Sequence, residues 1–175
     1  SFIARIRDNP AEQVAVVGSR NVPFLYWTAT SWAAAIALAK DTPDLIADLP
    51  IVDALIERAL DLDETFDHGA IHSFMIPSQA SRSSHIHDAP DRVRYHFRRA
   101  MELCDGQSAG PLVAMAEASA VPEQDRSEFE ELLNQALDIN PDAWPPGRLA
   151  NLIYQQRAQW LLQKVDRLFL EWPDE

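Results

Sequence analysis

Apolar residues recur along the chain in patches with helical spacing, and Pro, Asp, Asn and Ser separate one patch from the next. One patch has the i, i+3, i+4, i+7 spacing that gathers side chains on one helix face, at Phe129, Leu132, Leu133, Ala136 and Leu137. Such patches, divided by turn-forming residues, are typical of helices joined by loops. The pattern therefore predicts an all-α protein with few or no strands.

The same pattern predicts seven helices after an N-terminal segment whose first helix is poorly defined. Their expected ranges are 23–40, 45–62 (with 50 as an alternative start), 67–78, 90–104, 111–120, 125–139 and 147–171, and the last is expected to be the longest. The stretch SQASRSSHIHDAPD, from Ser78, predicts a loop, because its Ser, Pro and Asp residues leave no apolar face to bury. We assign residues 1–22 to an N-terminal segment, partly helical or irregular, and residues 23–175 to a single helical-repeat domain.

Three segments of the chain align without gaps: IERALDLDETF, FRRAMELCDGQ and LNQALDINPDA. Each carries a small residue at the same place, at Ala59, Ala100 and Ala136. The copies are 41 and 36 residues apart, somewhat longer than the ~34 residues of a tetratricopeptide repeat, and inserted loops would account for the difference. Because a small side chain lets a neighbouring helix approach closely, we expect these alanines to be buried at helix contacts.

The third copy ends in a helix stop, since Pro141 lacks an amide donor and disfavours a helical residue before it. The helices that would precede or follow each copy, in HGAIHSFMIPSQ and GPLVAMAEASAV, lack the usual Trp, Leu-Gly and Tyr signature. The repeats therefore predict a degenerate tetratricopeptide-like array of antiparallel helix hairpins, an α-α superhelix.

The net charge of −12 argues against a nucleic-acid partner, because a surface that binds phosphates needs clustered Lys and Arg. The dense basic cluster in DRVRYHFRRAME has helical spacing and is typical of a solvated helix face. Cys104 cannot form an internal disulfide, since it is the single cysteine of the chain. No apolar run approaches the ~20 residues of a membrane-spanning helix. The chain starts at Ser1 without Met, and we expect that a leader segment has been removed.

The histidines and carboxylates give weak signals for chemistry. Four histidines lie close in sequence, at His68, His72, His85 and His87. Two imidazoles four residues apart can chelate zinc, but the HExxH glutamate and a Cys ligand are absent, so we assign no metal. The chain has no nucleophile motif and no glycine-rich phosphate loop, and its paired carboxylates recur on outer helix faces. We therefore predict a protein that is not an enzyme and needs no cofactor.

The aromatic residues suggest a binding surface. They gather in FLYWTATSWAAA and in the final helix, and packing of the repeats is the simpler interpretation, because aromatic residues dominate cores. The other interpretation is a groove for a ligand or a partner, as on the concave side of helical arrays. The candidate groove residues are Tyr26, Trp27, Trp32, Phe74, Asn151, Tyr154, Arg157 and Trp160. We expect Asn151 and Arg157 to join adjacent helices rather than to touch a ligand.

The stretch FEELLNQALDINPDAWPPGRLANLIYQQRAQWLLQKVDRLF, together with LYWTATSW and DHGAIHSFM, closely resembles the T-component family of tripartite ATP-independent periplasmic (TRAP) transporters. The resemblance covers roughly residues 23–170. It implies a tetratricopeptide-like, lipid-anchored protein that faces the periplasm and associates with the transporter's substrate-binding subunit, with a small apolar or organic-acid ligand as a further expectation. No lipid-carrying Cys precedes Ser1, and Cys104 is mid-chain, so the implied anchor is expected outside these residues.

Two functions follow. The first is an accessory TRAP transporter component that binds by a groove, and it allows a homo-oligomer. The alternative is a general tetratricopeptide scaffold that clamps an acidic peptide with Arg94, Arg98 and Arg99.

Overall fold

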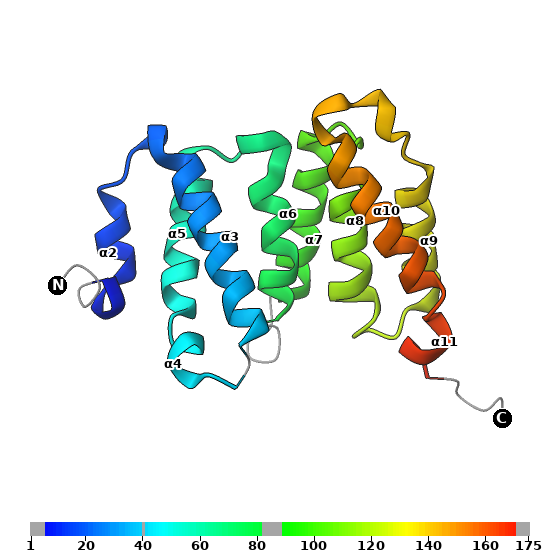
Figure 1. Cartoon of the computed structure of the whole chain (residues 1–175), viewed down its shortest axis with the longest axis horizontal. Coiled ribbons are helices and arrows are strands. Elements are labelled where there is room, and N and C mark those ends of the chain that lie inside the picture. The colour runs from blue at the N-terminus through cyan, green and yellow to red at the C-terminus, as the bar shows by residue number, and fades with distance from the viewer. Residues whose placement is uncertain (1–5, 40, 82–88, 171–175) are drawn as a thin grey trace. The chain divides into compact units, whose positions relative to one another are not determined.

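A computed structural model describes residues 6–39, 41–81 and 89–170 of the chain. Within these ranges all regular elements are helical, which confirms the predicted all-α class (Figure 1). The backbone divides into two compact units, Ser1–Asp67 and His68–Glu175. The boundary expected at residue 22 is a different division, and the assignment of residues 23–175 to one domain stays a prediction.

The first unit is built from short and long helices that begin with proline. They are α2 (Pro10–Ala15), α3 (Val22–Leu38), α4 (Pro43–Ile46) and α5 (Leu49–Leu62), with a 3-10 turn, η1 (Ser19–Asn21), before α3. Each of the four α-helices has Pro in its first two positions, where the amide that proline lacks has no intrahelical acceptor. The prolines therefore fix where these helices start.

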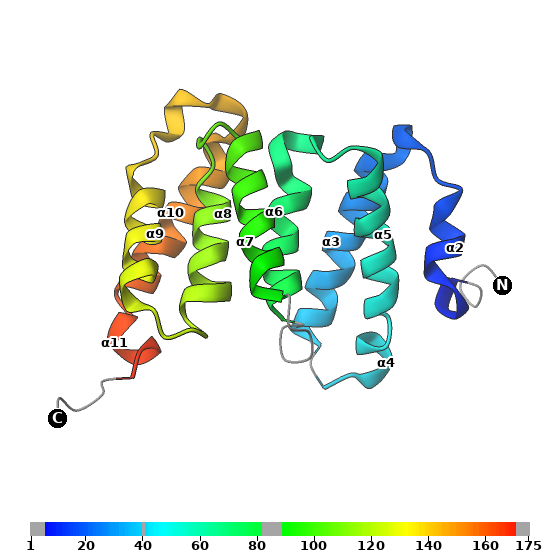
Figure 2. The same cartoon turned by 180° about the vertical axis from the view of Figure 1, so that it is seen from behind.

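Helix α5 is the centre of the first unit and packs against both α2 and α3 (Figures 1 and 2). Its buried face carries Ile51, Val52, Leu55, Ile56 and Ala59. Removing such aliphatic side chains from water stabilises the unit by about 1.5–3 kcal/mol each. This face agrees with the apolar stripe expected from the sequence.

Two arginines attach the N-terminal residues to the region around α5. Arg7 forms a two-pronged ion pair with the buried Asp48, with Nε–Oδ1 at 2.9 Å and Nη2–Oδ2 at 3.0 Å. Arg58 donates from Nε and Nη2 to the carbonyl of Val17, at 3.1 and 2.8 Å. Residues 6–21 are thus held onto the first unit by polar contacts as well as by apolar packing.

The second unit contains the longer helical series. Its elements are α6 (Phe66–Ala80), which starts just before the boundary, α7 (Ala89–Leu103), α8 (Ala109–Met115), a π-helical turn η3 (Ala116–Ala120), α9 (Arg126–Asp138), the 3-10 turns η4 (Pro141–Ala143) and η5 (Pro145–Gly147), α10 (Arg148–Leu162) and α11 (Val165–Leu168). Helices α8, α9 and α10 pack against one another, and α7 packs against α8. The loop expected from Ser78 is shorter than predicted, since α6 continues to Ala80; residues 82–88 lie outside the described residues.

The core of the second unit contains the repeated small residue. Ala100 and Ala136 have no exposed surface, and neither does Ala59 in the first unit. The expected burial of all three alanines is therefore confirmed. Phe129 and Leu133 of α9 are also fully buried. The tetratricopeptide-like arrangement of the hairpins stays a prediction.

The end of α9 is satisfied by a side chain from α10. The Nε2 amide of Gln155 lies 3.1, 3.2 and 2.7 Å from the carbonyl oxygens of Ala136, Leu137 and Ile139. The last carbonyls of a helix have no intrahelical donors, so this amide replaces them. Gln155 thus holds the end of α9 against α10.

The predicted final helix over 147–171 is wrong in its length. Helix α10 ends at Leu162, and α11 follows as a separate turn, so α3, with 17 residues, is the longest helix in the described ranges. The break lets the chain bring Phe169 onto Phe129, with ring centroids 5.0 Å apart and Phe169 buried. A continuous helix would follow a straight axis, and the gain from burying this aromatic ring explains the turn.

Candidate functional site

An open apolar groove runs along the outer side of α3 in the first unit. It has a volume of about 690 Å³ and is lined by Pro23, Phe24, Trp27, Thr28, Ser31, Trp32, Ala35 and Leu45. All but Leu45 belong to α3, where their spacing follows successive helical turns. The opposite side of α3 carries Val22, Leu25, Ala29 and Ile36, which are buried. The helix is therefore apolar on both sides, and among the described residues of the unit only one side is buried.

The chemistry of the groove is apolar and uncharged. Trp27 has 59% of its surface exposed, and Trp32 is half-buried beside it. Thr28 and Ser31 are the polar side chains of the lining, which contains no ionisable residue. An apolar ligand would gain by covering the two indoles, whereas a carboxylate would lose water without gaining a cation.

Six of the eight predicted groove residues lie outside this lining, and Tyr26 and Phe74 are two of them. Tyr26 contacts the edge of Trp27, with ring centroids 5.1 Å apart, and packs against Phe66 at 5.3 Å. It is half-buried and supports the groove rather than lining it. Phe74 is half-buried on α6, in the second unit.

Asn151 holds the inner face of α10. It is fully buried, its Oδ1 accepts a hydrogen bond from the Ala109 amide at 2.9 Å, and its Nδ2 donates to the Gln107 carbonyl at 2.8 Å. The amide of Ala109 lies in the first turn of α8, where it has no intrahelical acceptor. Asn151 thus joins α10 to the start of α8, the structural role expected for it.

Tyr154, Arg157 and Trp160 lie towards the outside of α10. The ring of Tyr154 covers Gly110 so closely that a Cβ there would lie 2.9 Å from the ring. Arg157 pairs with Glu117 of the π-helical turn, with Nη2–Oε1 at 2.5 Å, and its guanidinium carbon lies 4.5 Å from the Trp160 ring centroid. Arg157 therefore joins two elements, as expected, but it is half exposed rather than buried.

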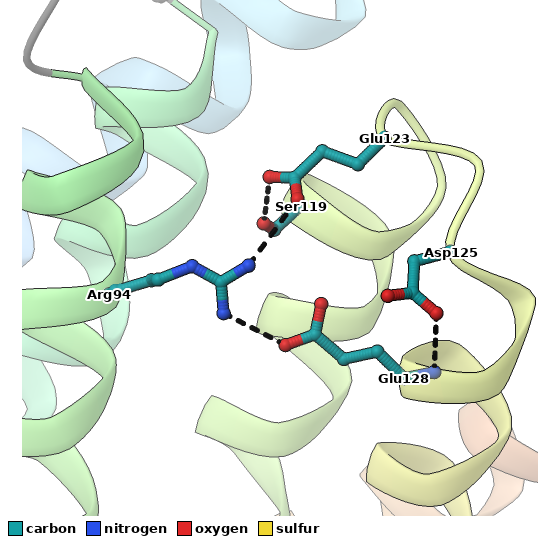
Figure 3. Close-up of polar contacts among 5 residues, drawn as sticks. All are labelled: Arg94, Ser119, Glu123, Asp125 and Glu128. Atoms are coloured by element: carbon teal, nitrogen blue, oxygen red, sulfur yellow. Dashed lines mark hydrogen bonds and ion pairs between the residues drawn. The ribbon is translucent and has the colours of Figure 1, made fainter.

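Two arginines of the basic cluster of α7 form ion pairs within the chain. Arg94 reaches between two carboxylates, with Nη1 2.9 Å from Glu128 Oε1 and Nη2 3.3 Å from Glu123 Oε2 (Figure 3). The hydrogen bond to Glu128 raises the pKa of the Arg94 guanidinium above its ordinary value. Arg99 pairs with Glu102 on its own helix. Two of the three arginines expected to clamp an acidic peptide thus already hold carboxylates of this chain.

Glu123 and Glu128, which hold Arg94, each make one further contact, through the carboxylate of Glu123 and the backbone amide of Glu128. The Ser119 hydroxyl donates to Glu123 at 2.6 Å, and the backbone amide of Glu128 donates to the N-cap Asp125 at 2.9 Å (Figure 3). The cluster joins α7 to the π-helical turn and to α9. Its role is to fix these elements.

The histidines do not gather as the sequence spacing suggested. His68 is exposed and lies edge-on to Trp144 at 5.0 Å, while His72 is buried. The Nδ1 atom of His72 lies 2.9 Å from Nδ1 of His96, a partner that spacing alone did not indicate. His85 and His87 lie outside the described residues. Within the described ranges, no group of three or more His, Cys, Asp or Glu is placed to hold a metal ion.

Sequence reasoning missed two parts of the surface. Phe24 and Leu45 line the groove, and Phe24 could have been found from its helical spacing to Trp27 and Thr28. Leu149 and Ile153 are exposed on α10, although apolar residues at such spacing usually face a core. In the part of the chain that the structure describes, no helix has the length and apolarity to cross a membrane.

The sequence of this chain matches the model of a known protein family. Residues 4–169 match the model of the family described as TRAP transporter T-component. The chain is also 27% identical over 151 residues to an uncharacterized protein of Treponema pallidum (strain Nichols). That alignment covers 86% of this chain and 47% of the relative, so the chain spans about half the length of the curated relative that it matches.

Proposed function

The chain belongs to the TRAP transporter T-component family, and from this premise we propose that it is a non-enzymatic accessory component of such a transporter. It works by non-covalent binding: it binds the substrate-binding subunit in the periplasm, and it holds a small ligand in the groove of α3. The full-length protein is lipid-anchored there. The family match over residues 4–169 is the observation that carries the proposal.

The groove supports an apolar ligand over an organic acid. Its lining offers two indoles, a phenyl ring and aliphatic carbon, and no Lys, Arg or His that would pair with a carboxylate. A volume of about 690 Å³ lies within the range of small-molecule sites. The ligand is therefore a small molecule whose bound part is uncharged.

The acidic-peptide scaffold gains no support from the described contacts. Arg94 would have to give up Glu123 and Glu128 to bind a peptide carboxylate, and each exchange would replace one ion pair by another. Such an exchange yields little net free energy, because the chain loses what the peptide gains. The accessory-component proposal needs no such rearrangement.

The binding of the partner is tested with purified proteins. We expect isothermal titration of this protein with the substrate-binding subunit of a TRAP transporter to show a complex at micromolar concentrations. If no heat is released and the two proteins sediment separately at these concentrations, the partner part of the proposal is wrong.

The groove is tested with a neutral solvatochromic dye such as Nile red. We expect Trp32→Ala to weaken dye binding about tenfold or more, because buried aromatic contacts dominate such sites. Leu38→Ala is the matched control: Leu38 lies on the same helix and is 90% exposed, outside the groove lining. Equal effects of the two substitutions would contradict a site in the groove.

A further inference from the structure

Helix α10 has two faces of opposite character. Asn151, Ala158 and Leu161 are buried against the neighbouring helices. On the other side, Leu149, Ile153 and Trp160 expose 71%, 56% and 46% of their surfaces. A helix with 3.6 residues per turn brings these three side chains to one stripe, with Arg157 at its edge. We call these four residues the α10 outer face.

The α10 outer face contains a side-chain pair that is fixed in advance. Arg157 is held on one side by Glu117 and lies over the Trp160 ring at 4.5 Å. Both side chains therefore lose little rotational freedom when a partner covers them. Tryptophan and arginine are also the residues that most often contribute large binding energies at protein interfaces.

The charge around this face differs from that of the whole chain. The formal net charge is −12, yet residues 148–168 contain Arg148, Arg157, Lys164 and Arg167 against the single acidic residue Asp166. The apolar stripe thus lies in a segment where basic residues outnumber acidic ones, and two of them, Arg148 and Arg157, pair with Asp142 and Glu117. A surface of this kind fits apolar side chains bordered by carboxylates, and its charge steers such a partner towards it.

We propose that the α10 outer face is the docking surface for a partner protein that presents an apolar patch bordered by carboxylates. The inference rests on the proposed function, in which that partner is the substrate-binding subunit of the transporter. Leu149, Ile153 and Trp160 supply the apolar area, and the basic excess of residues 148–168, which includes Lys164 and Arg167, supplies the charge. The α3 groove takes no part in this contact.

The test compares substitutions on two sides of the same helix. Ile153→Asp places a carboxylate in the stripe, and Gln159→Asp places the same charge at an exposed position of α10 outside it. Titration with the substrate-binding subunit is expected to show Kd raised at least about tenfold by Ile153→Asp and less than about twofold by Gln159→Asp. Helical ellipticity of each variant shows that the fold is kept.

Ile153→Lys separates charge from apolar contact. Both Lys and Asp remove the isoleucine, but only Asp repels a carboxylate-bordered partner, so Ile153→Lys should weaken binding clearly less than Ile153→Asp. Equal losses with Lys and Asp would overturn the assignment of an acidic partner surface. Equal losses with Ile153→Asp and Gln159→Asp would overturn the docking surface itself.

Other occupants of the face give distinct results. If Ile153→Asp changes the sedimentation of this protein alone and leaves partner binding unchanged, a second copy covers the face and the proposal is wrong. If it abolishes binding to vesicles of equal parts phosphatidylcholine and phosphatidylglycerol while partner binding persists, the face binds lipid and the proposal is also wrong. Absence of any complex with the unsubstituted protein would instead contradict the proposed function.

Discussion

The buried histidine pair shows how single residues tie α6 to α7. His72 and His96 expose 0% and 5% of their surfaces, and their Nδ1 atoms lie 2.9 Å apart. Only one proton fits between the two nitrogens, so one ring donates and the other accepts. If both rings carried protons on Nδ1, two donors would face each other in a buried site. The contact therefore requires that at least one imidazole stay neutral.

The pair predicts a loss of stability in acid. Burial, together with the charges of His72 and Arg92, lowers the pKa of His96 to about 4, below the ~6.5 of an exposed histidine. Between these values the unfolded chain binds more protons than the folded one, so the free energy of unfolding falls as the pH falls, by up to ~1.4 kcal/mol per pH unit from this group. The contribution of neutral His96 to the free energy of unfolding is fully present above the ~6.5 pKa of histidine in the unfolded chain.

Urea unfolding at a series of pH values checks this contribution. His96→Gln should flatten the slope of stability against pH between about 6.5 and 4. Gln159→Leu, at an exposed residue of α10 that carries no titratable group, should leave the slope as in the unsubstituted protein. Identical slopes for all three proteins would show that His96 does not titrate as stated.

At the scale of the element, the contact of α10 with α8 depends on one buried amide. Asn151→Leu keeps the branching at Cγ, although Leu is larger than Asn, and it leaves the Ala109 amide and the Gln107 carbonyl without this partner. We expect the free energy of unfolding to fall by about 2–4 kcal/mol, because two buried polar groups lose their hydrogen bonds.

Chemical denaturation measures this loss, with Gln159→Leu as the control. Gln159 lies on the same helix but is exposed, so its substitution should change stability by less than ~0.5 kcal/mol. A similar, small effect of both substitutions would mean that water takes the place of the Asn151 amide and that α10 is held by apolar packing alone.

The elements also show what the sequence could and could not predict. Burial of Ala59, Ala100 and Ala136 was predictable, because close helix contacts need a small residue at a fixed place in each copy. The orientation of α10 was not, since Leu149, Ile153 and Trp160 are exposed while the polar Asn151 is fully buried. Periodicity shows that a stripe exists, but the partner that covers it is set by tertiary packing.

The aromatic residues illustrate the same limit. The sequence indicated a surface at Trp27 and Trp32, and both line the groove. It could not show that Tyr26, one residue from Trp27, supports the groove instead of lining it. That position depends on the contact of Tyr26 with Phe66, forty residues along the chain. The end of α10 at Leu162 could likewise not be predicted from the sequence, since it depends on the contact of Phe169 with Phe129.

At the scale of the whole molecule, the two candidate surfaces belong to different compact units. The groove is lined by residues of Ser1–Asp67, and the α10 outer face lies in His68–Glu175. The joint between the units has consecutive left-handed residues at Asp67, His68 and Gly69, with φ of 45°, 54° and 86°. No residue is shared between the surfaces, so each is expected to bind its own target.

This separation predicts additive effects. Trp32→Ala should weaken dye binding and leave partner binding unchanged, Ile153→Asp should do the reverse, and the double variant should show both losses within ~0.5 kcal/mol of the singles. Paired titrations of the four proteins measure this. A larger deviation would show that occupation of the groove and docking of the partner are coupled.

The contact of Gln155 with the end of α9 limits which segment of the chain can be transferred to another helical protein. Residues 125–144 form one capped helix followed by a proline stop, yet the carbonyls at the end of α9 are satisfied by a side chain of α10. A chimaera that receives this helix and turn alone would lack the Gln155 amide that binds the last carbonyls of α9. The smallest exchangeable piece of the chain therefore extends past its own proline, through Gln155.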